Sequence, residues 1–596
     1  MGESTPHHIP CMNALAAKYG WPQENERGYR ITESLAGTKR PMRIVHVGCG
    51  AAGICLAKFI PDRVENVSFV CYDKNSDIGG TWLENRYPGC ACDIPSPDYQ
   101  FTWARNPNWS NFYSSSPEIW KYFKQVVDQH SLGKFMKLNH KVEGAYWDSE
   151  RGKWKVHVRD LLVDKTFIDE CDIFINGGGI LNNWKMPEID GLESFNGLLV
   201  HTAAYPEGTD LNGKRVAVIG IGSSGVQVIA KIASQVSKLY TWVRSPTWIT
   251  TGFAQKYAGE GGQNVTYSAE QKKQWRENYP EYLQYCKDIE TELNQRFKFI
   301  LTGSEDAQSA LRFSVDEMKS KLAGREDLIE SLIPTEFGIG CRRPTPGNGF
   351  LEALTLPHVH TFTKSGIARI TENGFVTTNG EEHEVDVIIC ATGFDTTWVP
   401  RFPIVHDGRN AQDFMRERTL SYLAMAIPEV PNYFTVGGPY GPVGHGNTLM
   451  VNERLISNIL KIVEKMQLEG IKSIRPKLGV CEDFEEHAQL FCKRTAWDGK
   501  CASWFKQGKK DGKLTIWPGS RLLFFEAMKD PRYEDYDIEY LSGNTWGWLG
   551  CGFTLKEYDG SDIAYYIGTE EHPGAMLPEE SAKTESRAPW GVPGNL

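Results

Sequence analysis

Two glycine-rich turns constrain this chain more than any other feature of its 596 residues. The first lies in RIVHVGCGAAGICLAKFI and the second in KRVAVIGIGSSGVQVIAKIA. Each follows a short apolar segment and opens a helical pattern with the spacing G-x-G-x-x-G, which lets backbone N–H groups approach a pyrophosphate at a helix N-terminus. A second apolar segment follows each motif, VSFVCY and LYTWVR. The sequence therefore predicts an α/β fold with two Rossmann-like dinucleotide-binding domains.

The residues that end the two following strands predict different dinucleotides. Asp73, twenty positions after Gly53 (73 minus 53), can accept hydrogen bonds from a ribose 2′-hydroxyl, as FAD or NAD requires. Arg244 and Ser245 hold the matching place in the second motif and suit a 2′-phosphate, so we expect NADPH there. A solvated surface charge is the alternative for Arg244. The residues assigned to phosphate binding are Gly48, Gly50, Gly53, Gly220, Gly222, Ser223, Ser224 and Gly225.

A second internal repeat indicates how the two domains are connected. KWKVHVRD and TFIDE lead into CDIFINGGG, and FVTTNG and EEHEV lead into DVIICATGFD. Both predict a small antiparallel meander that precedes a buried strand ending in a glycine turn. We therefore expect the second domain to be inserted in the first. Charged helical patterns between about 265 and 330 predict a helical insertion, in the plainest interpretation a cap that supports a substrate cleft.

The length of the chain requires more than one domain, because single hydrophobic cores stop growing at roughly 250 to 300 residues. We place an N-terminal extension at 1–40 and the first part of the FAD-binding domain at 41–205. The NADPH-binding domain with its helical insertion follows at 206–395. The second part of the FAD domain and a C-terminal substrate-side region occupy 396–596.

Charge and patterning exclude several classes of partner. The 65 Lys and Arg against 75 Asp and Glu leave a net charge of -10, which argues against a nucleic-acid surface. The start, MGESTPHHIP, has no cationic region followed by an apolar one, and no apolar stretch approaches about 18 residues. We expect a soluble, cytoplasmic protein with no membrane partner. Its 14 cysteines, scattered singly apart from Cys90 and Cys92, suit reduced thiols better than a disulfide framework.

The segment GGTWLENRYPGCACD, Gly79 to Asp93, allows three interpretations of its cysteines. Cys90 and Cys92 could form a redox pair, provide half of a metal site, or be incidental to the residues around them. A redox pair is usually Cys-x-x-Cys, and a zinc site needs two more ligands at suitable spacing. Neither pattern is present, so we predict incidental thiols and no metal site.

The same segment resembles the signature of Baeyer-Villiger monooxygenases, with Gly-Gly-x-Trp, then Tyr-Pro-Gly, then Asp. A second family fingerprint is matched by Phe195, Gly197, His201 and Pro206 in FNGLLVHTAAYP, where Tyr205 replaces the usual Trp. The resemblance extends from about residue 40 to 570. It includes GIGCRRPTPGNGFLEAL and CASWFKQGKKDGKLTIWPGSRLLFFEAM, and late segments such as DIAYYI resemble the fungal secondary-metabolism branch.

The resemblance implies that oxygen chemistry occurs on reduced flavin, through a peroxide anion that attacks a carbonyl. By resemblance, Arg343 is the cation that stabilises this anion, and Asp93 lies beside the flavin and holds Arg343 in place. A fixed cation in a site of low dielectric also stabilises the oxyanion formed on addition. Arg342 matches a family position that helps to bind the 2′-phosphate beside Arg244. Adjacent side chains tend to point apart, so one arginine can face each cofactor.

Other positions receive roles only through the resemblance. Thr81, Trp82 and Tyr99 match positions that line FAD, although the two aromatic residues could also be ordinary core residues. His201 matches a residue that links the two nucleotide domains, with a structural hydrogen bond as the alternative. Trp504 resembles a mobile-loop residue on the substrate side, and a packed core position is the alternative.

These observations lead to one expected activity and two alternatives. We expect FAD- and NADPH-dependent insertion of one oxygen atom from O2 beside a hydrophobic polycyclic or terpenoid ketone. The product would be an ester or lactone of secondary metabolism, and the enzyme a monomer or weak homo-oligomer. Oxidation of nitrogen or sulfur, or hydroxylation, is the first alternative, for which Tyr205 is the best argument. A non-catalytic NADPH-binding flavoprotein is the second.

Overall fold

The computed structural model of the protein describes residues 12–569. Residues 1–11 of the expected N-terminal extension and residues 570–596 of the expected C-terminal region lie outside them. The chain divides into a large compact unit, residues 39–541, and a small unit that joins residues up to 38 with residues from 542 onward. The large unit contains both glycine turns.

The first parallel sheet of the large unit has the strand order β20-β7-β1-β2-β3. Its strands are nearly all buried, as expected for a parallel sheet with both faces covered, and β2 has the bounds of the predicted segment VSFVCY. The sheet is completed by a strand that follows the whole second domain, which confirms the predicted insertion. The strands are β1 (Met42–Val47), β2 (Val67–Tyr72), β3 (Met136–Lys137), β7 (Ile173–Asn176) and β20 (Tyr433–Thr435).

The second parallel sheet repeats this arrangement with the order β13-β10-β9-β17-β8. Strand β9 leads through the second glycine turn into helix α5 (Ser223–Ile232), as β1 leads through the first into α2 (Ala51–Arg63). Two Rossmann-like units, as predicted, are therefore present. The strands are β8 (Leu198–His201), β9 (Arg215–Ile219), β10 (Lys238–Trp242), β13 (Val359–Phe362) and β17 (Val387–Cys390).

Each sheet has the antiparallel meander predicted from the internal repeat. In the first half, β4, β5 and β6 pair antiparallel before the chain enters β7. In the second, β14, β15 and β16 do the same before β17. The meanders consist of β4 (His140–Asp148), β5 (Lys153–Asp160), β6 (Lys165–Cys171), β14 (Ile367–Thr371), β15 (Gly374–Thr377) and β16 (Glu382–Glu384).

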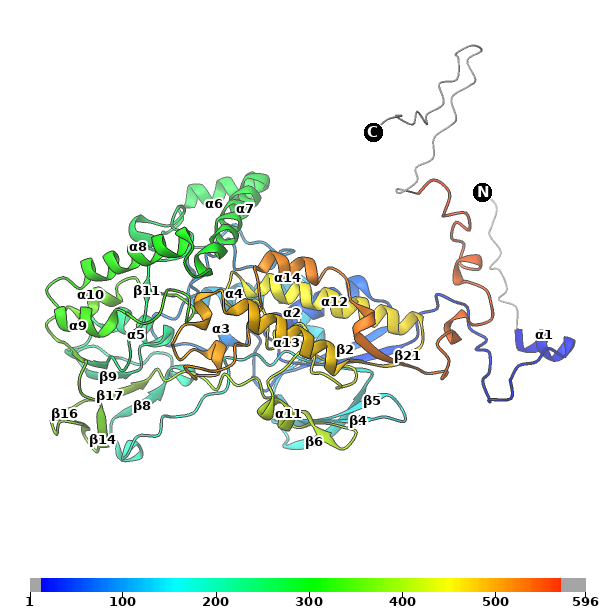
Figure 1. Cartoon of the computed structure of the whole chain (residues 1–596), viewed down its shortest axis with the longest axis horizontal. Helices are drawn as coiled ribbons and strands as arrows, with labels where there is room; N and C mark the ends of the chain where they lie inside the picture. Colours follow the sequence, from blue (N-terminus) through cyan, green and yellow to red (C-terminus); the bar gives the residue numbers. More distant parts are fainter. Residues whose placement is uncertain (1–11, 570–596) are drawn as a thin grey trace, which may run out of the picture. The chain divides into compact units, whose positions relative to one another are not determined.

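The predicted helical insertion consists of four helices, which Figure 1 shows in green. They are α6 (Ala269–Glu277), α7 (Tyr279–Gln295), α8 (Glu305–Lys321) and α9 (Glu326–Leu332). Ser268 and Ser304 cap α6 and α8 by accepting backbone N–H groups of the first turn, which satisfies donors that a helix start leaves free. Buried residues such as Trp275 and Leu328 bind these helices to the main apolar core.

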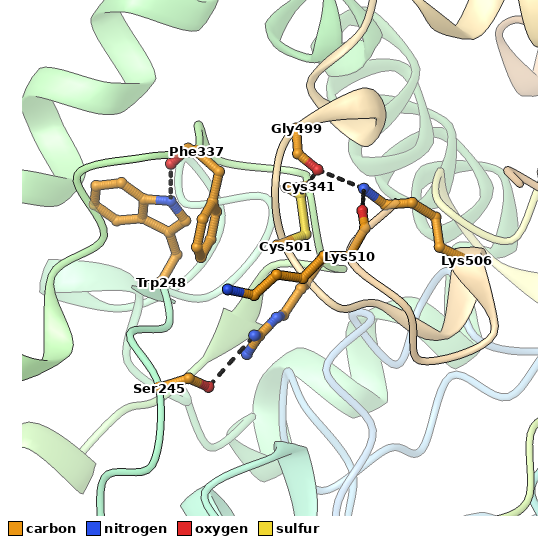
Figure 2. The surroundings of a disulfide bond; sticks show 9 residues. Ser245, Trp248, Phe337, Cys341, Gly499, Cys501, Lys506 and Lys510 are labelled. Carbon is orange, nitrogen blue, oxygen red and sulfur yellow. Dashed lines mark hydrogen bonds between the residues drawn. A yellow bond between two sulfur atoms is a disulfide. The ribbon is translucent and has the colours of Figure 1, made fainter. Parts of the chain in front are cut away.

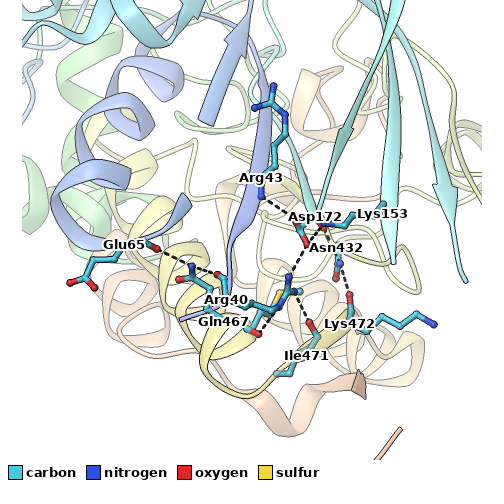
Figure 3. A network of polar contacts seen from close by, with 10 residues as sticks. Arg40, Arg43, Glu65, Lys153, Asp172, Asn432, Gln467, Ile471 and Lys472 are labelled. Atoms are coloured by element: carbon cyan, nitrogen blue, oxygen red, sulfur yellow. Dashed lines mark hydrogen bonds and ion pairs between the residues drawn. The ribbon is translucent and has the colours of Figure 1, made fainter. Parts of the chain in front are cut away.

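A polar network ties the first sheet to segments from the far end of the chain (Figure 3). The Asp172 carboxylate accepts from Arg40 Nη1 at 2.9 Å and lies 2.7 Å from Lys153 Nζ. Burial opposes its charge, but these cations and a backbone N–H lower the pKa of Asp172 overall. Asn432 Nδ2 donates to the carbonyl oxygens of Asp172 and Lys472, each at 3.0 Å. The network therefore holds early and late strands in one sheet.

The remaining elements surround these sheets or belong to the small unit. In the small unit, Ala36 N–H donates to the carbonyl oxygen of Phe553 at 2.8 Å and Cys551 N–H donates to that of Ser34 at 3.0 Å. Within residues 12–569, no helix combines the length and apolar character needed to cross a bilayer. The further elements are α1 (Met12–Tyr19), α3 (Thr81–Glu84), α4 (Ser116–Gln129), α10 (Phe350–Leu354), α11 (Ala411–Glu417), α12 (Thr448–Leu468), α13 (Leu478–Cys492), α14 (Arg521–Ala527), β11 (Ile249–Thr250), β12 (Thr345–Pro346), β18 (Ile404–His406), β19 (Arg409–Asn410), β21 (Ile471–Pro476) and β22 (Tyr536–Tyr540).

Candidate active site

The first glycine turn forms a cradle at the start of α2. Gly48 has a φ of 104°, a backbone conformation that favours glycine, and Gly50 is the N-cap of the helix. A Cβ on Gly53 would lie 2.2 Å from the carbonyl oxygen of Gly48, so only glycine lets the helix approach the strand this closely. The turn therefore exposes backbone N–H groups at a helix N-terminus, as a pyrophosphate requires.

Asp73 follows the end of β2 beside this cradle. Its side chain is buried, and its carboxylate accepts from Cys49 N–H at 2.7 Å and from Asn75 N–H at 2.8 Å. Burial raises the pKa of Asp73, although both backbone donors lower it. The carboxylate is thus held rigidly at the place where the ribose of a bound dinucleotide would lie.

The segment that carries the Gly-Gly-x-Trp signature continues the same site. Thr81 begins the short helix α3, and the Trp82 Nε1–H donates to the Tyr99 hydroxyl at 3.1 Å. The rings of Trp82 and Tyr99 meet edge to face with centroids 5.5 Å apart. All three residues line the cavity described below, which supports cofactor contact rather than a purely structural role for the two aromatic residues.

The second glycine turn repeats the geometry of the first at the start of α5. Gly220 has a φ of 112°, Gly222 is the N-cap, and Ser223 and Ser224 form the first turn of the helix. A Cβ on Gly225 would lie 1.9 Å from the carbonyl oxygen of Gly220. This cradle therefore has the same tight contact between strand and helix as the first.

Three residues predicted to read a 2′-phosphate lie on the same side of this second cradle. Arg342 Nη2 donates to Ser245 Oγ at 3.5 Å, and Arg342 Nε is buried without a partner in the described structure. Burial lowers the pKa of Arg342, and the neighbouring charge of Arg244 lowers it further. Two mutually repelling guanidinium groups beside a hydroxyl form a site that an anion would stabilise.

Arg343 points toward the first cradle and pairs with Asp93 through two parallel hydrogen bonds. Its Nη2 donates to Asp93 Oδ1 at 2.8 Å, and its Nη1 donates to Oδ2. Burial disfavours the cation, but the Asp93 carboxylate outweighs burial and raises the pKa of Arg343. The guanidinium also lies 5.5 Å from the centroid of the Phe253 ring. Arg343 is therefore a fixed cation beside Asp93 of the first domain, whereas Arg342 donates to Ser245 of the second.

One cavity of about 1730 Å³ connects both cradles. His201, Gly53 and Gly225 do not line it; the two glycines act through the contacts between helix and strand. The predicted residues that line the cavity are Gly48, Gly50, Asp73, Thr81, Trp82, Asp93, Tyr99, Gly220, Gly222, Ser223, Ser224, Arg244, Ser245, Arg342, Arg343 and Trp504.

His201 lies outside the cavity, where the connections between the two domains meet. Its ring stacks on Trp184 with centroids 4.7 Å apart and planes 7° apart, and it meets Phe394 edge to face at 6.3 Å. Its Nδ1 accepts the Ala203 N–H at 3.1 Å. Burial lowers the pKa of His201, which keeps the imidazole neutral. These contacts with both connecting segments support a linking role rather than contact with a cofactor.

The cysteines divide into thiols and one bridge. Burial raises the pKa of Cys90 to about 11 and that of Cys92 well above its ordinary value, so neither is a poised thiolate. In the described part of the chain, eleven cysteines are free thiols. The expectation of reduced thiols is wrong for Cys341 and Cys501, which form a disulfide. The two residues are 160 positions apart, and no local pattern marks such a pair in a sequence.

The structure also shows a contact between the two domains that sequence reasoning missed. Gln227, on α5 of the second domain, accepts from the Tyr87 hydroxyl at 2.8 Å and donates to the carbonyl oxygen of Ala91 at 3.0 Å. Tyr87 and Ala91 belong to the signature segment of the first domain. A polar residue between Val226 and Val228 was the only signal. Gln227 therefore helps to set the distance between the two cradles.

Comparisons with known proteins agree with this geometry. A model of the flavin-binding monooxygenase-like family matches residues 41–315. The FAD-binding monooxygenase tazF of Aspergillus terreus is 36% identical over 558 residues, which cover 92% of this chain and 98% of the relative. A Baeyer-Villiger monooxygenase of Pseudomonas aeruginosa is 28% identical over 491 residues, or 82% of this chain and 90% of that protein. The chain belongs to the family of flavin-binding monooxygenases that includes these FAD-binding and Baeyer-Villiger enzymes.

Solved structures match the monooxygenase over most of its length. Cyclohexanone monooxygenase from Rhodococcus bound to NADP+ has a TM-score of 0.72 and 25% identity, covering 84% of this chain and all of that one. Oxidized steroid monooxygenase bound to NADP has a TM-score of 0.71 with the same identity and coverage. The enzyme is thus an NADPH-dependent flavin monooxygenase that uses FAD and NADP. Its two tight cradles, Asp73 and the Arg244–Arg342 pair fit these groups.

Proposed function

We propose that the enzyme inserts one oxygen atom from O2 beside the carbonyl of a hydrophobic polycyclic or terpenoid ketone. The product would be an ester or lactone in the biosynthesis of a secondary metabolite. The observation that carries this proposal is the doubly hydrogen-bonded Arg343–Asp93 pair in the cavity that joins the two glycine cradles. N- or S-oxidation does not require a cation to stabilise an oxyanion on the substrate, whereas addition to a ketone does.

Arg343 has the central electrostatic role in this proposal. Bound FAD, once reduced by NADPH, supplies the activation of dioxygen. The Arg343 guanidinium is held by two bonds and is part-buried, so it stabilises negative charge on oxygen without reorganising during the reaction. Asp93 fixes the direction of the planar guanidinium group of Arg343. The carboxylate accepts one hydrogen bond from each of Nη1 and Nη2, so the other N–H groups remain to donate to a bound group.

The charged residues at the strand ends separate the two cofactors. We assign the FAD ribose to Asp73 and the NADPH 2′-phosphate to Arg244, Ser245 and Arg342. We accordingly assign residues 41–205 together with 396–596 to FAD and the substrate side, and residues 206–395 to NADPH. His201 would maintain the connection between these parts through its stack on Trp184.

The substrate class is supported by the chemistry of the cavity rather than by the fold. The fold accommodates both a cyclohexanone monooxygenase and a steroid monooxygenase, so it does not itself choose between one ring and several. In this chain, apolar side chains in the cavity wall, Trp504 among them, offer surface for a large ketone. The fungal relative tazF is consistent with the proposed fungal branch.

The test is product analysis with isotope-labelled dioxygen. Purified enzyme and NADPH are incubated with polycyclic ketones, terpenoid ketones and, as a matched panel, thioethers and tertiary amines of similar size. We expect one labelled oxygen in an ester or lactone. A labelled sulfoxide or N-oxide with no ester from any ketone would instead favour the alternative for which Tyr205 argues. Sedimentation of the same sample would test the proposed monomer or weak homo-oligomer, and imaging of a fluorescent fusion would test the cytoplasmic location.

A further inference from the structure

The Cys341–Cys501 disulfide joins two segments that both contribute to the cavity wall (Figure 2). Arg342 and Arg343 directly follow Cys341, and Trp504 is three positions after Cys501. All three of these side chains line the cavity. The bridge therefore lies one residue from the proposed phosphate-binding arginine and two residues from the proposed catalytic arginine.

Each of the two segments is anchored on its own side of the bridge. In the segment before Cys341, the Trp248 Nε1–H donates to the carbonyl oxygen of Phe337 at 3.0 Å. In the segment around Cys501, the buried Lys506 ammonium donates to the carbonyl oxygens of Gly499 and, at 2.9 Å, Lys510. Figure 2 shows these two sets of bonds on opposite sides of the sulfur–sulfur bond. Each segment thus has hydrogen bonds of its own that do not involve the bridge.

The disulfide is the main polar or covalent link between these two segments. Cys341 Sγ lies 3.2 Å from the carbonyl oxygen of Gly499. Within residues 12–569, no ion pair or further hydrogen bond joins residues 338–344 to residues 499–512. Gly499 packs against Cys341 and Phe337, because a Cβ on Gly499 would lie 3.2 Å and 3.3 Å from their side chains. Without the bond, only packing would hold the arginine segment against the segment that carries Trp504.

We propose that the Cys341–Cys501 disulfide is a positioning element of the active site. It holds the Arg342–Arg343 segment against residues 499–504, so that one arginine reaches Ser245 and the other reaches Asp93 at the same time. Cys341 and Cys501 are positioning residues that touch neither cofactor. The inference rests on the proposed roles of Arg342 and Arg343. The oxidation state of Cys341 and Cys501 then controls how well NADPH consumption is coupled to oxygen insertion.

A dithiol can break the bond in two exchange steps, once the segments separate enough to admit it. Cys341 and Cys501 are 0% and 1% exposed, so a reagent reaches the sulfur atoms only when the wall opens. One thiolate of the reductant attacks one Sγ and the sulfur–sulfur bond breaks; its second thiol then closes a cyclic disulfide. The protein gains two electrons and two protons as two thiols. Both glycine cradles are untouched by this exchange.

The experiment compares Cys341→Ser and Cys501→Ser holoenzymes with Cys492→Ser. Cys492 is a buried free thiol in the apolar cluster that also contains Phe505, so it is a matched control for losing a sulfur atom nearby. We measure NADP+ affinity, the rate of flavin reduction by NADPH at saturation, and product formed per NADPH consumed. Misplacing a fixed group can cost up to roughly a hundredfold in rate, so we expect about a tenfold loss of coupling and severalfold weaker NADP+ binding in both bridge variants. The rate of flavin reduction at saturating NADPH should change little in the two bridge variants. The Cys492→Ser enzyme should resemble the wild type in all three measurements.

A second arm uses the wild-type enzyme, so the proposal does not depend on whether a variant folds. After treatment with a dithiol, alkylation under denaturing conditions followed by mass measurement should count two more thiols than before. Coupling and NADP+ affinity should both fall as the disulfide is reduced, and reoxidation by oxidised glutathione should restore both. Absence of the bond in purified enzyme, or unchanged coupling and affinity after complete reduction, would overturn the proposal. Failure of the proposed ketone oxidation is distinguishable, because thiol counts and NADP+ affinity are measured without a ketone.

Discussion

The two nucleotide-binding halves have nearly the same glycine turn but different residues at the end of the next strand. A Cβ on the third glycine would lie 2.2 Å from the carbonyl oxygen of the first in one half and 1.9 Å in the other. Asp73, in the first half, is buried and already accepts two backbone N–H groups. Arg244, in the second, is exposed and makes no ion pair within residues 12–569.

The residue at the end of the second strand therefore adapts one architecture to two cofactors. A carboxylate held by the protein's own donors is ready for a neutral ribose and needs no further charge. An exposed arginine beside the half-buried Arg342 leaves a positive site that a 2′-phosphate would balance. The carboxylate of the first half is therefore held by the protein's own backbone donors, whereas the two arginines of the second half form no ion pair within residues 12–569. Three sets of substitutions test this comparison.

Arg343→Ala should have the largest effect, because it removes the cation proposed to stabilise negative charge on oxygen. We expect FAD and NADPH still to bind and the flavin still to be reduced. Formation of ester or lactone should fall by about 100- to 1000-fold, the range typical for loss of one oxyanion-stabilising donor. The measurements are anaerobic flavin reduction and product formation in stopped-flow and quenched reactions.

Arg343→Lys is the matched control, since it keeps the charge and loses the planar fork, and partial activity is expected. Asp93→Ala should also impair product formation, because the guanidinium would lose both of its bonds to the carboxylate. Oxygenation of ketone by Arg343→Ala at the wild-type rate would place the chemistry elsewhere and strengthen the N- or S-oxidising alternative.

Paired glycine substitutions should have the next largest effect and separate the halves. Gly225→Ala places a methyl group against the carbonyl oxygen of Gly220, and overpacking of this kind costs about 1 to 3 kcal/mol. NADP+ affinity should fall by about tenfold or more while FAD content stays at the wild-type level. Gly53→Ala should show the opposite pattern. Fluorescence titration measures NADP+ affinity, and flavin absorbance measures FAD content. Loss of the same cofactor in both variants would contradict the assignment of the halves.

Arg244→Ala should have the most limited effect of the three, because it removes one contact with the 2′-phosphate and leaves both glycine turns intact. A hydrogen bond to a charged group contributes about 1.5 to 3 kcal/mol, so NADPH binding should weaken by about tenfold or more. NADH lacks the phosphate and should bind almost as before, which makes it the internal control. Titration with both coenzymes is the measurement. Equal losses for both would show that Arg244 does not read the 2′-phosphate.

Much of the fold could be predicted because its signals are local. The glycine turns, the apolar strands and the repeated meander each depend on residues close in the sequence, and β2 has the bounds of its predicted segment. The site residues were a different case. Arg343 and Asp93 are 250 positions apart, and only the resemblance to a family paired them before the structure showed their two hydrogen bonds.

Contacts that no local pattern encodes were missed. Gln227 binds Tyr87 across the two domains, and His201 stacks on Trp184 where the connecting segments meet. Residues 12–38 pack with residues 542–569 in a separate unit, a pairing that no sequence pattern indicated. Each of these contacts depends on the path of the chain through the whole fold, which decides which distant segments become neighbours.

The sequence by itself determined the two dinucleotide cradles and the charge that distinguishes them. A G-x-G-x-x-G turn between a strand and a helix has few possible backbone conformations, and the residue at the end of the next strand lies beside it in any such fold. Only the tertiary structure decided which residues stand between the cradles. Arg342 donates to Ser245 and Arg343 donates to Asp93, and Cys341, the residue before them, is bonded to Cys501. Cysteine spacing does not specify a partner 160 residues away, since pairing follows from proximity in the folded chain.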